Sequence, residues 1–164
     1  PKMEVYDKFT QEFEKMSKRV GKEQYAVPYL MSSHPGSTLN DAIELALYMK
    51  KHKINPKQVQ DFYPTPSTIS TCMYYTGLDP RTMQEVYVAR TPREKALQRA
   101  LLQWKRPDKR GLVLEALREA GRTDLIGFGK NCLVRPDRNA AGKKAPAKGD
   151  AAKAEAAKAA EKNK

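Results

Sequence analysis

The sequence predicts an α/β fold built around one strand–helix–strand unit. Residues 25–31 are apolar and aromatic without polar alternation, which is typical of a strand buried in a parallel sheet. Residues 59–63 read as a second strand, and residues 38–52 between them have the periodicity of an amphipathic helix. One such unit cannot bury both faces of a parallel strand pair. The sequence therefore also predicts a piece of a larger protein, which fits a chain that begins Pro1-Lys2-Met3.

The region before the first strand is predicted to be an amphipathic helix over residues 3–20, with Gly21 placed to end it. We expect its apolar stripe to pack on the following strand. The stripe comprises Val5, Phe9, Phe13, Met16 and Val20. Pro28 lacks the N–H that a central strand needs, so it indicates an edge position, a bulge or a late start to the strand.

The helix between the strands has clear boundary signals. Ser37 or Thr38 can cap its acidic first turn, and its last turn, near His52, is basic, so the charges complement the helix dipole. Its buried face is predicted to comprise Leu39, Ile43, Ala46, Leu47 and Met49. After the second strand, residues 67–76 fit either a short strand or a turn of helix, and residues 85–89 fit a short strand.

Two further helices are predicted to form a helical hairpin. The first begins at Thr91-Pro92 and has Glu94 three residues after the cap, which is the pattern of a capping box. The second begins near Pro107 and ends at Gly121. Their apolar stripes comprise Ala96, Leu97, Ala100, Leu101 and Trp104, then Leu112, Leu114, Ala116, Leu117 and Ala120. Residues 125–134 follow as a loop with room for a short strand at 132–134.

The net charge of +12 is the main argument for a nucleic-acid partner. Residues 138–164 hold eight Lys/Arg and three Asp/Glu, and both signs are well mixed in the rest of the chain, which is typical of a solvated surface. From residue 139 onward the sequence is rich in Ala and Lys without large apolar residues, which predicts disorder. This tail can touch RNA or an acidic partner through its charge, or can serve only to keep the protein in solution.

The cysteine and hydropathy patterns bear on two classes of protein, those that bind a metal through cysteines and those that span a membrane. Cys72 and Cys132 stand alone without metal-ligand spacing, so the chain shows no zinc or iron–sulfur motif. Two isolated cysteines without a signal peptide predict a reducing, cytoplasmic setting, although the sequence leaves a disulfide open. No apolar run is long enough to span a membrane, so no membrane partner is expected.

The ends of the two predicted strands carry the unusual polar residues. Ligands of α/β folds bind at the carboxyl ends of parallel strands, and the two turns that follow them are expected to be adjacent in space. The first turn contains Gly36, which lets a backbone approach a ligand closely, and it leads into a helix N-terminus that favours a carboxylate, phosphate or ribose oxygen. His34 is either a structural turn residue or a ligand contact, and Thr65 or Ser67 either caps a helix or contacts the ligand. The candidate site residues are Ser32, Ser33, His34, Gly36, Gln60, Asp61 and Thr65.

Five blocks of this sequence resemble the carboxyl-terminal part of the YgiQ-type radical S-adenosylmethionine (SAM) proteins. The blocks are residues 24–38, 59–66, 70–77, 99–103 and 125–129, and the resemblance covers residues 25–136. It implies that residues 1–69 are the last strands and helices of a radical SAM partial (β/α) barrel. Residues 70–137 would then be an appended, mostly helical domain of unknown function, and residues 138–164 a disordered tail outside the resemblance.

The resemblance also implies an activity for the full-length protein. Such an enzyme would bind a [4Fe–4S] cluster and SAM and generate a 5′-deoxyadenosyl radical, with the candidate residues lining the cofactor or substrate cavity. This chain has no Cys-x-x-x-Cys-x-x-Cys loop, and Cys72 is not part of one, so no metal is assigned to it. The chain is therefore expected to be inactive alone, to bind neither cofactor by itself, and to need the missing N-terminal part of the barrel as its partner. Its second turn reads Pro66-Ser67-Thr68, where the wider superfamily often has Pro-Gly-Thr.

Two alternatives remain open at the level of sequence. The chain can be a basic nucleic-acid or protein-binding module without catalysis, carried by residues 70–164. The appended domain can also have a purely structural role, in which it covers the open barrel.

Overall fold

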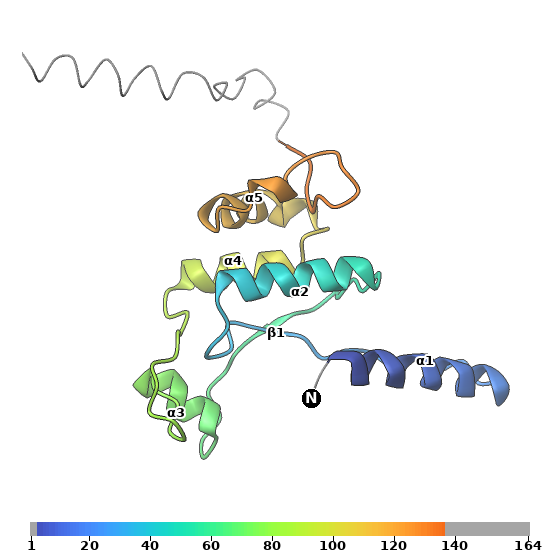
Figure 1. Cartoon of the computed structure of the whole chain (residues 1–164), viewed down its shortest axis with the longest axis horizontal. Coiled ribbons are helices and arrows are strands. Elements are labelled where there is room, and N and C mark those ends of the chain that lie inside the picture. The colour runs from blue at the N-terminus through green and yellow to red at the C-terminus, as the bar shows by residue number, and fades with distance from the viewer. Residues whose placement is uncertain (1–2, 137–164) are drawn as a thin grey trace, which may run out of the picture.

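A computed structural model describes residues 3–136 (Figure 1). In chain order the elements are α1 (Met3–Arg19), β1 (Met31–Ser32), α2 (Leu39–Lys51), β2 (Gln60–Asp61), α3 (Ile69–Thr76), α4 (Pro92–Leu102), the 3-10 helix η1 (Pro107–Lys109), α5 (Arg110–Glu119) and the 3-10 helix η2 (Thr123–Leu125). The predicted α/β class is confirmed at this level, whereas membership of a barrel stays a prediction. The predicted disordered tail lies outside the described residues.

The predicted strand–helix–strand unit is present, with strands much shorter than expected. β1 and β2 pair in parallel, with Met31 opposite Gln60 and Ser32 opposite Asp61, and α2 forms the connection between them. Residues 22–30 run without regular secondary structure, so the first strand begins late. Of the alternatives that Pro28 indicated, the late start is therefore observed, since β1 begins at Met31, three residues after the proline. Each strand pairs only with the other among the described residues, so no further ladder extends them.

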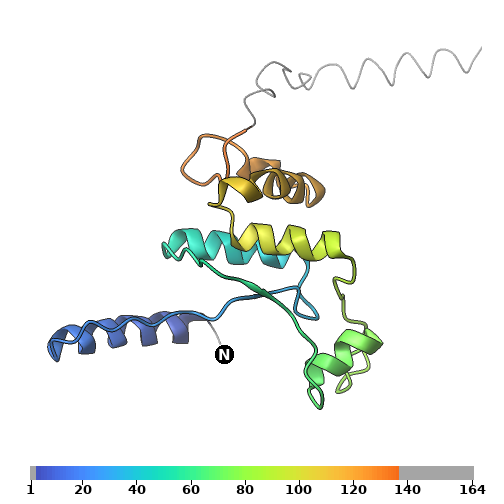
Figure 2. The ribbon, with the colours of Figure 1, turned by 180° about the vertical axis from the view of Figure 1, so that it is seen from behind.

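The hydrophobic core lies between α2, α4 and α5. α4 packs against both α2 and α5 and also contacts the strand pair (Figures 1 and 2). The largest side chains with almost no exposed surface include Ile43, Met49, Leu97, Leu101, Val113, Leu114 and Leu117. The core joins helices on both sides of residue 69, and the division into two domains there stays a prediction.

Local capping explains where the core helices begin. Thr38 caps α2 and forms a capping box with Asp41, and Thr91 caps α4 and forms one with Glu94. In each box the threonine hydroxyl accepts a hydrogen bond from a backbone N–H of the first turn, while the acidic side chain accepts one from the threonine N–H. Both helices begin where the sequence predicts, because these signals are contained within four consecutive residues.

Helix α1 corrects the expectation about its apolar stripe. The helix forms as predicted, and Gly21, at φ +65°, ends it with a hydrogen bond from Lys22 N–H to Ser17 O of 3.0 Å. The stripe is not buried on a strand: Val5 is 61% and Phe9 57% exposed. In Figures 1 and 2, α1 projects away from the body of the protein. Residues 22–30, which follow α1, do not pair with another strand, so they form no sheet face against which the stripe could pack.

Of the two alternatives for residues 67–76, the helix is the one that forms, over residues 69–76. Its cap is Thr68 rather than Thr65 or Ser67. Residues 85–89 form no strand, and only one isolated bridge joins Leu78 to Glu85. The backbone there bonds to turns instead of a strand, with Val86 N–H donating to Gly77 O at 2.7 Å. Likewise residues 132–134 contribute only a single bridge, between Ile126 and Val134.

Among the described residues, no helix combines the length and the apolar character needed to cross a membrane.

Candidate functional site

The carboxyl ends of β1 and β2 lie together and are tied by side chains. Ser32 is buried, and its hydroxyl donates to Asp61 Oδ1 at 2.6 Å. Beyond the strands, Phe62 N–H donates to Ser32 O at 2.8 Å and so holds the start of the second turn against the first. The sequence prediction that the two turns are adjacent in space is therefore confirmed.

Asp61 links the strand ends to α4. Its second carboxylate oxygen, Oδ2, accepts a hydrogen bond from Arg99 Nη1, and the two groups form an ion pair. Both side chains are partly exposed, at 25% for Asp61 and 37% for Arg99. The carboxylate at the strand end is thus already neutralised by a cation from a helix that lies 38 residues further along the chain. Sequence reasoning identified Asp61 and missed Arg99.

The turn after β1 is clamped from α4 by the side chain of Gln98. Gln98 is 1% exposed; its Oε1 accepts from Ser33 N–H at 3.0 Å, and its Nε2 donates to Ser37 O at 2.8 Å. One amide therefore holds both ends of the turn of residues 33–37. A glutamine beside Leu97 on the buried face of a predicted helix was the sequence signal for this contact, because a buried amide requires polar partners.

Ser33 is the most unusual residue of the turn. It has a φ of +60°, in the left-handed region that non-glycine residues seldom adopt. Its side chain is buried, and its hydroxyl has no hydrogen-bond partner among the described residues. A strained backbone and an unsatisfied buried hydroxyl both cost stability, and such features concentrate at functional sites.

His34 projects from the same turn and is exposed. Its Nδ1 lies 2.8 Å from Pro35 O, and its Nε2 lies 3.0 Å from Ser70 Oγ at the start of α3. A carbonyl oxygen can only accept, so the proton of the neutral ring belongs on Nδ1, and Nε2 then accepts from the Ser70 hydroxyl. The ring also meets the edge of Phe62, with ring centroids 5.1 Å apart. The imidazole is thereby oriented, with its second nitrogen in contact with a hydroxyl.

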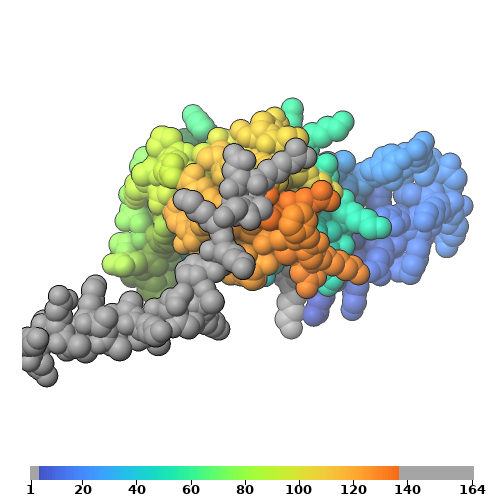
Figure 3. Space-filling model, turned by 90° about the horizontal axis from the view of Figure 1, so that it is seen from above, coloured from blue at the N-terminus to red at the C-terminus, as the bar shows by residue number. Residues whose placement is uncertain are grey.

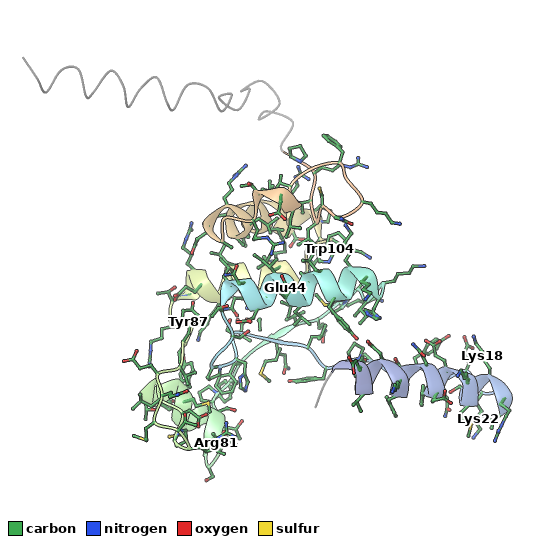
Figure 4. The ribbon with its side chains drawn as sticks, in the orientation of Figure 1. Lys18, Lys22, Glu44, Arg81, Tyr87 and Trp104 are labelled. Carbon is green, nitrogen blue, oxygen red and sulfur yellow. The ribbon has the colours of Figure 1, made fainter. Side chains whose placement is uncertain are left out.

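Gly36 and the start of α2 are occupied by contacts within the protein. Gly36, at φ +88°, donates its N–H to Tyr87 O at 2.8 Å, and Tyr87 lies between α2 and α3 (Figure 4). At the helix start, hydrogen bonds from Thr38 lower the pKa of Asp41 below its ordinary value. The N–H groups that the sequence suggested for an anion are therefore partly used by the turn and by the capping box.

Gln60 and Thr65 complete the set of predicted site residues. Both are exposed, and Gln60 Oε1 accepts a hydrogen bond from Tyr29 OH. The backbone oxygen of Thr65 accepts from the hydroxyls of Thr68, at 3.0 Å, and Thr71, at 2.6 Å. The structure thus brings Ser32, Gln60 and Asp61 together at the strand ends, whereas Thr65 lies in the turn that supports α3.

An apolar groove lies between α1, residues 28–30 and α2. Its volume is about 600 Å³. The lining is Val5, Tyr6, Phe9, Pro28, Tyr29, Leu30, Leu45, Tyr48, Met49 and Ile54. At its edge Tyr48 donates a hydrogen bond of 2.5 Å to Asp7 Oδ1, and burial together with this bond raises the pKa of Tyr48 to about 12. The tyrosine therefore stays protonated at neutral pH and holds α1 beside α2.

No metal centre is formed by the residues that the structure describes: within 3–136, no group of three or more His, Cys, Asp or Glu side chains is arranged to hold a metal ion. Cys72 and Cys132 are both free thiols.

Comparison with known proteins relates this chain to one family. Residues 57–164 match a family described as Domain of unknown function (DUF3362). A UPF0313 protein of Clostridium perfringens is 56% identical over 143 residues, which cover 87% of this chain and 22% of the relative. A UPF0313 protein of Methanocella arvoryzae is 54% identical over 144 residues, or 88% of this chain and 24% of the relative. The chain thus spans about a quarter or less of the length of these relatives. No solved structure matches it.

Proposed function

The chain belongs to the family described as Domain of unknown function (DUF3362), and on this premise we propose that it is the carboxyl-terminal part of a longer radical SAM enzyme. The resemblance to the end of a YgiQ-type protein, stated from the sequence, is supported by relatives that continue far beyond the matched region. The radical SAM activity itself rests on that resemblance and on the geometry of the strand ends.

One observation carries the proposal: two parallel strands joined by α2 end side by side in polar residues. This is the unit from which (β/α) barrels are built, and their functional residues lie at the carboxyl ends of the strands. Here Ser32 and Asp61 are opposite each other in register and hydrogen-bonded. A free-standing parallel pair is unusual, because parallel sheets are normally covered on both faces. The unit therefore fits the rim of a sheet that other strands complete.

The donor and acceptor groups at this rim suit SAM better than they suit an iron–sulfur cluster. The exposed groups at the strand ends are the His34 imidazole and the Gln60 amide, with the Thr65 hydroxyl further out in the turn that supports α3. The N–H groups of the Gln60 amide can hydrogen-bond the carboxylate of SAM, and His34 Nε2 can accept from its ammonium or ribose groups where SAM takes the place of the Ser70 hydroxyl. Bound together, the cluster and SAM supply a 5′-deoxyadenosyl radical. The cluster ligands belong to another part of the longer protein. In this chain Ser32, Asp61 and Arg99 hold the strand ends in place, and the Ser70 contact orients the His34 ring.

The partner of this chain, in our proposal, is the preceding part of the same barrel. The apolar groove beside α1 and the exposed Val5 and Phe9 are an unpartnered surface next to β1. Covering apolar area of this kind stabilises by about 25 cal/mol per Å². The missing strands and helices of the barrel would supply that cover, and the short β1 and β2 would lengthen when a third strand pairs with them.

The test uses a longer relative, such as the UPF0313 protein of Clostridium perfringens, purified without oxygen. We expect it to contain a [4Fe–4S] cluster and, when reduced, to convert SAM to 5′-deoxyadenosine and methionine. Replacement of the residue aligned with His34 by Ala should lower SAM affinity and cleavage while iron content is unchanged. An alanine at the residue aligned with Lys18, at the far end of α1 (Figure 4), is the matched control.

Two results separate the parts of this proposal. A longer protein that holds no cluster and does not cleave SAM would refute the enzyme class. A protein that cleaves SAM equally well with and without the His34 substitution would refute only the role of the strand-end residues.

A further inference from the structure

A basic hollow lies where the end of α2 meets the loop of residues 122–131. Its volume is about 710 Å³. The charged lining comprises Lys50, Lys51, Lys53, Arg122, Lys130 and a single acidic residue, Asp124. None of these residues belongs to the strand-end site. Figure 3 shows the orange loop segment beside the teal end of α2 on the upper face of the molecule.

The cations of the hollow fall into two groups. Two of them are structural: Lys50 Nζ donates to the backbone oxygens of Lys130, at 2.6 Å, and Cys132, at 2.5 Å, and Arg122 pairs with Asp124 at 3.1 Å. Within residues 3–136, the side chains of Lys51, Lys53 and Lys130 have no hydrogen bond or ion pair. Lys51, Lys53 and Lys130 are exposed. Three uncompensated positive charges therefore meet at one concave surface, which favours a ligand that carries several negative charges.

An exposed aromatic ring stands on the loop that borders the hollow. Phe128 is 81% exposed and is two residues from Lys130. Its loop is fixed at several points, among them the bond from Gly127 N–H to Val134 O of 2.9 Å and the two bonds from Lys50. A side chain at Gly127 would place its Cβ 2.9 Å from Cys132 Sγ, so any larger residue there would force the Cys132 side chain to move. The loop thus holds a large apolar ring in water on a fixed support.

We propose that this hollow binds single-stranded nucleic acid, with backbone phosphates on Lys51, Lys53 and Lys130 and an unpaired base stacked on Phe128. Grooves for single strands combine these two elements, cations that follow the backbone and aromatic rings on which bases stack. The carboxylates of an acidic peptide would meet the same lysines, but its Asp and Glu side chains would offer Phe128 no ring on which to stack. A duplex would keep its bases stacked internally and unavailable to the ring. The proposal does not depend on the radical SAM assignment, because it uses none of the strand-end residues.

The test is a fluorescence anisotropy titration of the complete 164-residue chain with a labelled oligouridylate, an oligodeoxythymidylate and a hairpin duplex. The first variant combines Lys51→Ala, Lys53→Ala and Lys130→Ala. The matched control combines Lys8→Ala and Lys18→Ala on α1 with Lys22→Ala just after the helix, which removes the same charge elsewhere. Figure 4 shows Lys18 and Lys22 at the far end of α1. All six lysines are exposed, so both variants should fold, which circular dichroism checks.

The hollow variant should raise the Kd for single strands by at least about tenfold, and the slope of log K against log salt should become shallower by about 2, since each lost phosphate contact of a single strand contributes about 0.7. The control should stay within about twofold of the parent Kd, since its charges lie away from the hollow. If both triple variants weaken binding equally, the binding is diffuse attraction to a basic chain and the proposed site is wrong.

The aromatic contribution is tested separately. Phe128→Ala should raise the Kd by about 5- to 150-fold with little change in the salt slope, because stacking of one base is an uncharged contact. Phe128→Trp should retain binding. An unchanged Kd for Phe128→Ala, equal affinity for the duplex, or no binding of either oligonucleotide at low salt would each overturn the proposal. Equal affinity for the two oligonucleotides would support a site that contacts the phosphates and the bases but not the sugars. A higher affinity for the oligouridylate would identify RNA as the preferred ligand.

Discussion

Helices α1 and α4 both carry an apolar stripe, but the two stripes lie in opposite environments. In α4, Leu97 and Leu101 are at most 1% exposed, because α2 lies on one side and α5 on the other. In α1, Val5 and Phe9 remain more than half exposed. The comparison shows that an apolar stripe predicts a helix and an interface but does not identify the partner. For α4 the partners are within residues 3–136, whereas for α1 we place the partner in the preceding part of a longer protein.

The largest expected effect comes from replacing two methionines, one in the core that α2 shares with α4 and one on the exposed stripe of α1. Met49 in α2 is 0% exposed and Met16 in α1 is 48% exposed. Met49→Ala should lower the free energy of unfolding by about 2–5 kcal/mol, because it leaves a cavity in the core. Met16→Ala should change it by less than about 0.5 kcal/mol. Urea unfolding of the isolated chain measures both, and equal losses would show that α1 is part of the same cooperative core.

A smaller effect is expected at the clamp between α4 and the strand ends. Gln98→Ala leaves Ser33 N–H and Ser37 O without their partners, so it should cost about 2–4 kcal/mol. Gln58→Ala, at an exposed position, is the control and should cost less than about 0.5 kcal/mol.

Amide exchange distinguishes the clamp from general destabilisation. The Ser33 amide should lose protection in Gln98→Ala to a greater extent than amides in the middle of α5. Uniform loss across both regions would show that Gln98 contributes only to packing.

The smallest expected effects concern the two capping boxes and depend on pH. Hydrogen bonds from Thr38 and Thr91 lower the pKa values of Asp41 and Glu94 in the folded protein. A lowered pKa means that the unfolded chain binds protons first, so this stabilisation is present above the unfolded values of 3.8 and 4.5 and is lost as the pH falls through the lowered ones. Thr38→Ala or Thr91→Ala should cost about 1 kcal/mol at neutral pH.

The measurement is the free energy of unfolding at a series of pH values from neutral down into the acid range. The parent should lose stability below about pH 5, and the difference between the parent and each threonine variant should shrink there. A difference that is constant with pH would show that the carboxylates of the capping boxes contribute nothing.

The features that the sequence predicted correctly are determined by neighbouring residues. Thr38 and Thr91 start helices, and Gly21 and Gly121 end them at positive φ, because the necessary groups lie within one turn of the chain. The parallel pairing followed from the two strand-like segments and the helix between them. The adjacency of Ser32 and Asp61 followed in turn from parallel pairing.

The features that the sequence did not predict depend on distant contacts. Gln98 meets Ser33 across 65 positions and Arg99 meets Asp61 across 38. A glutamine on a buried helix face indicates that polar partners exist, but the neighbouring sequence does not indicate which distant residues they are. Residues 85–89 alternate like a strand, but their neighbours are turns, so no ladder forms. The exposed stripe of α1 could not be foreseen either, because periodicity is the same whether or not the partner is present.

The central claim is that α1 and the groove beside it are covered by the preceding part of a longer protein. Hydrogen–deuterium exchange of the peptides that span α1 and residues 22–30 tests this most directly, compared between the isolated chain and the longer Clostridium perfringens relative. We predict rapid exchange in the isolated chain and strong protection in the longer protein, with α4 and α5 protected in both. Equally rapid exchange of the α1 peptides in the longer protein would contradict the claim.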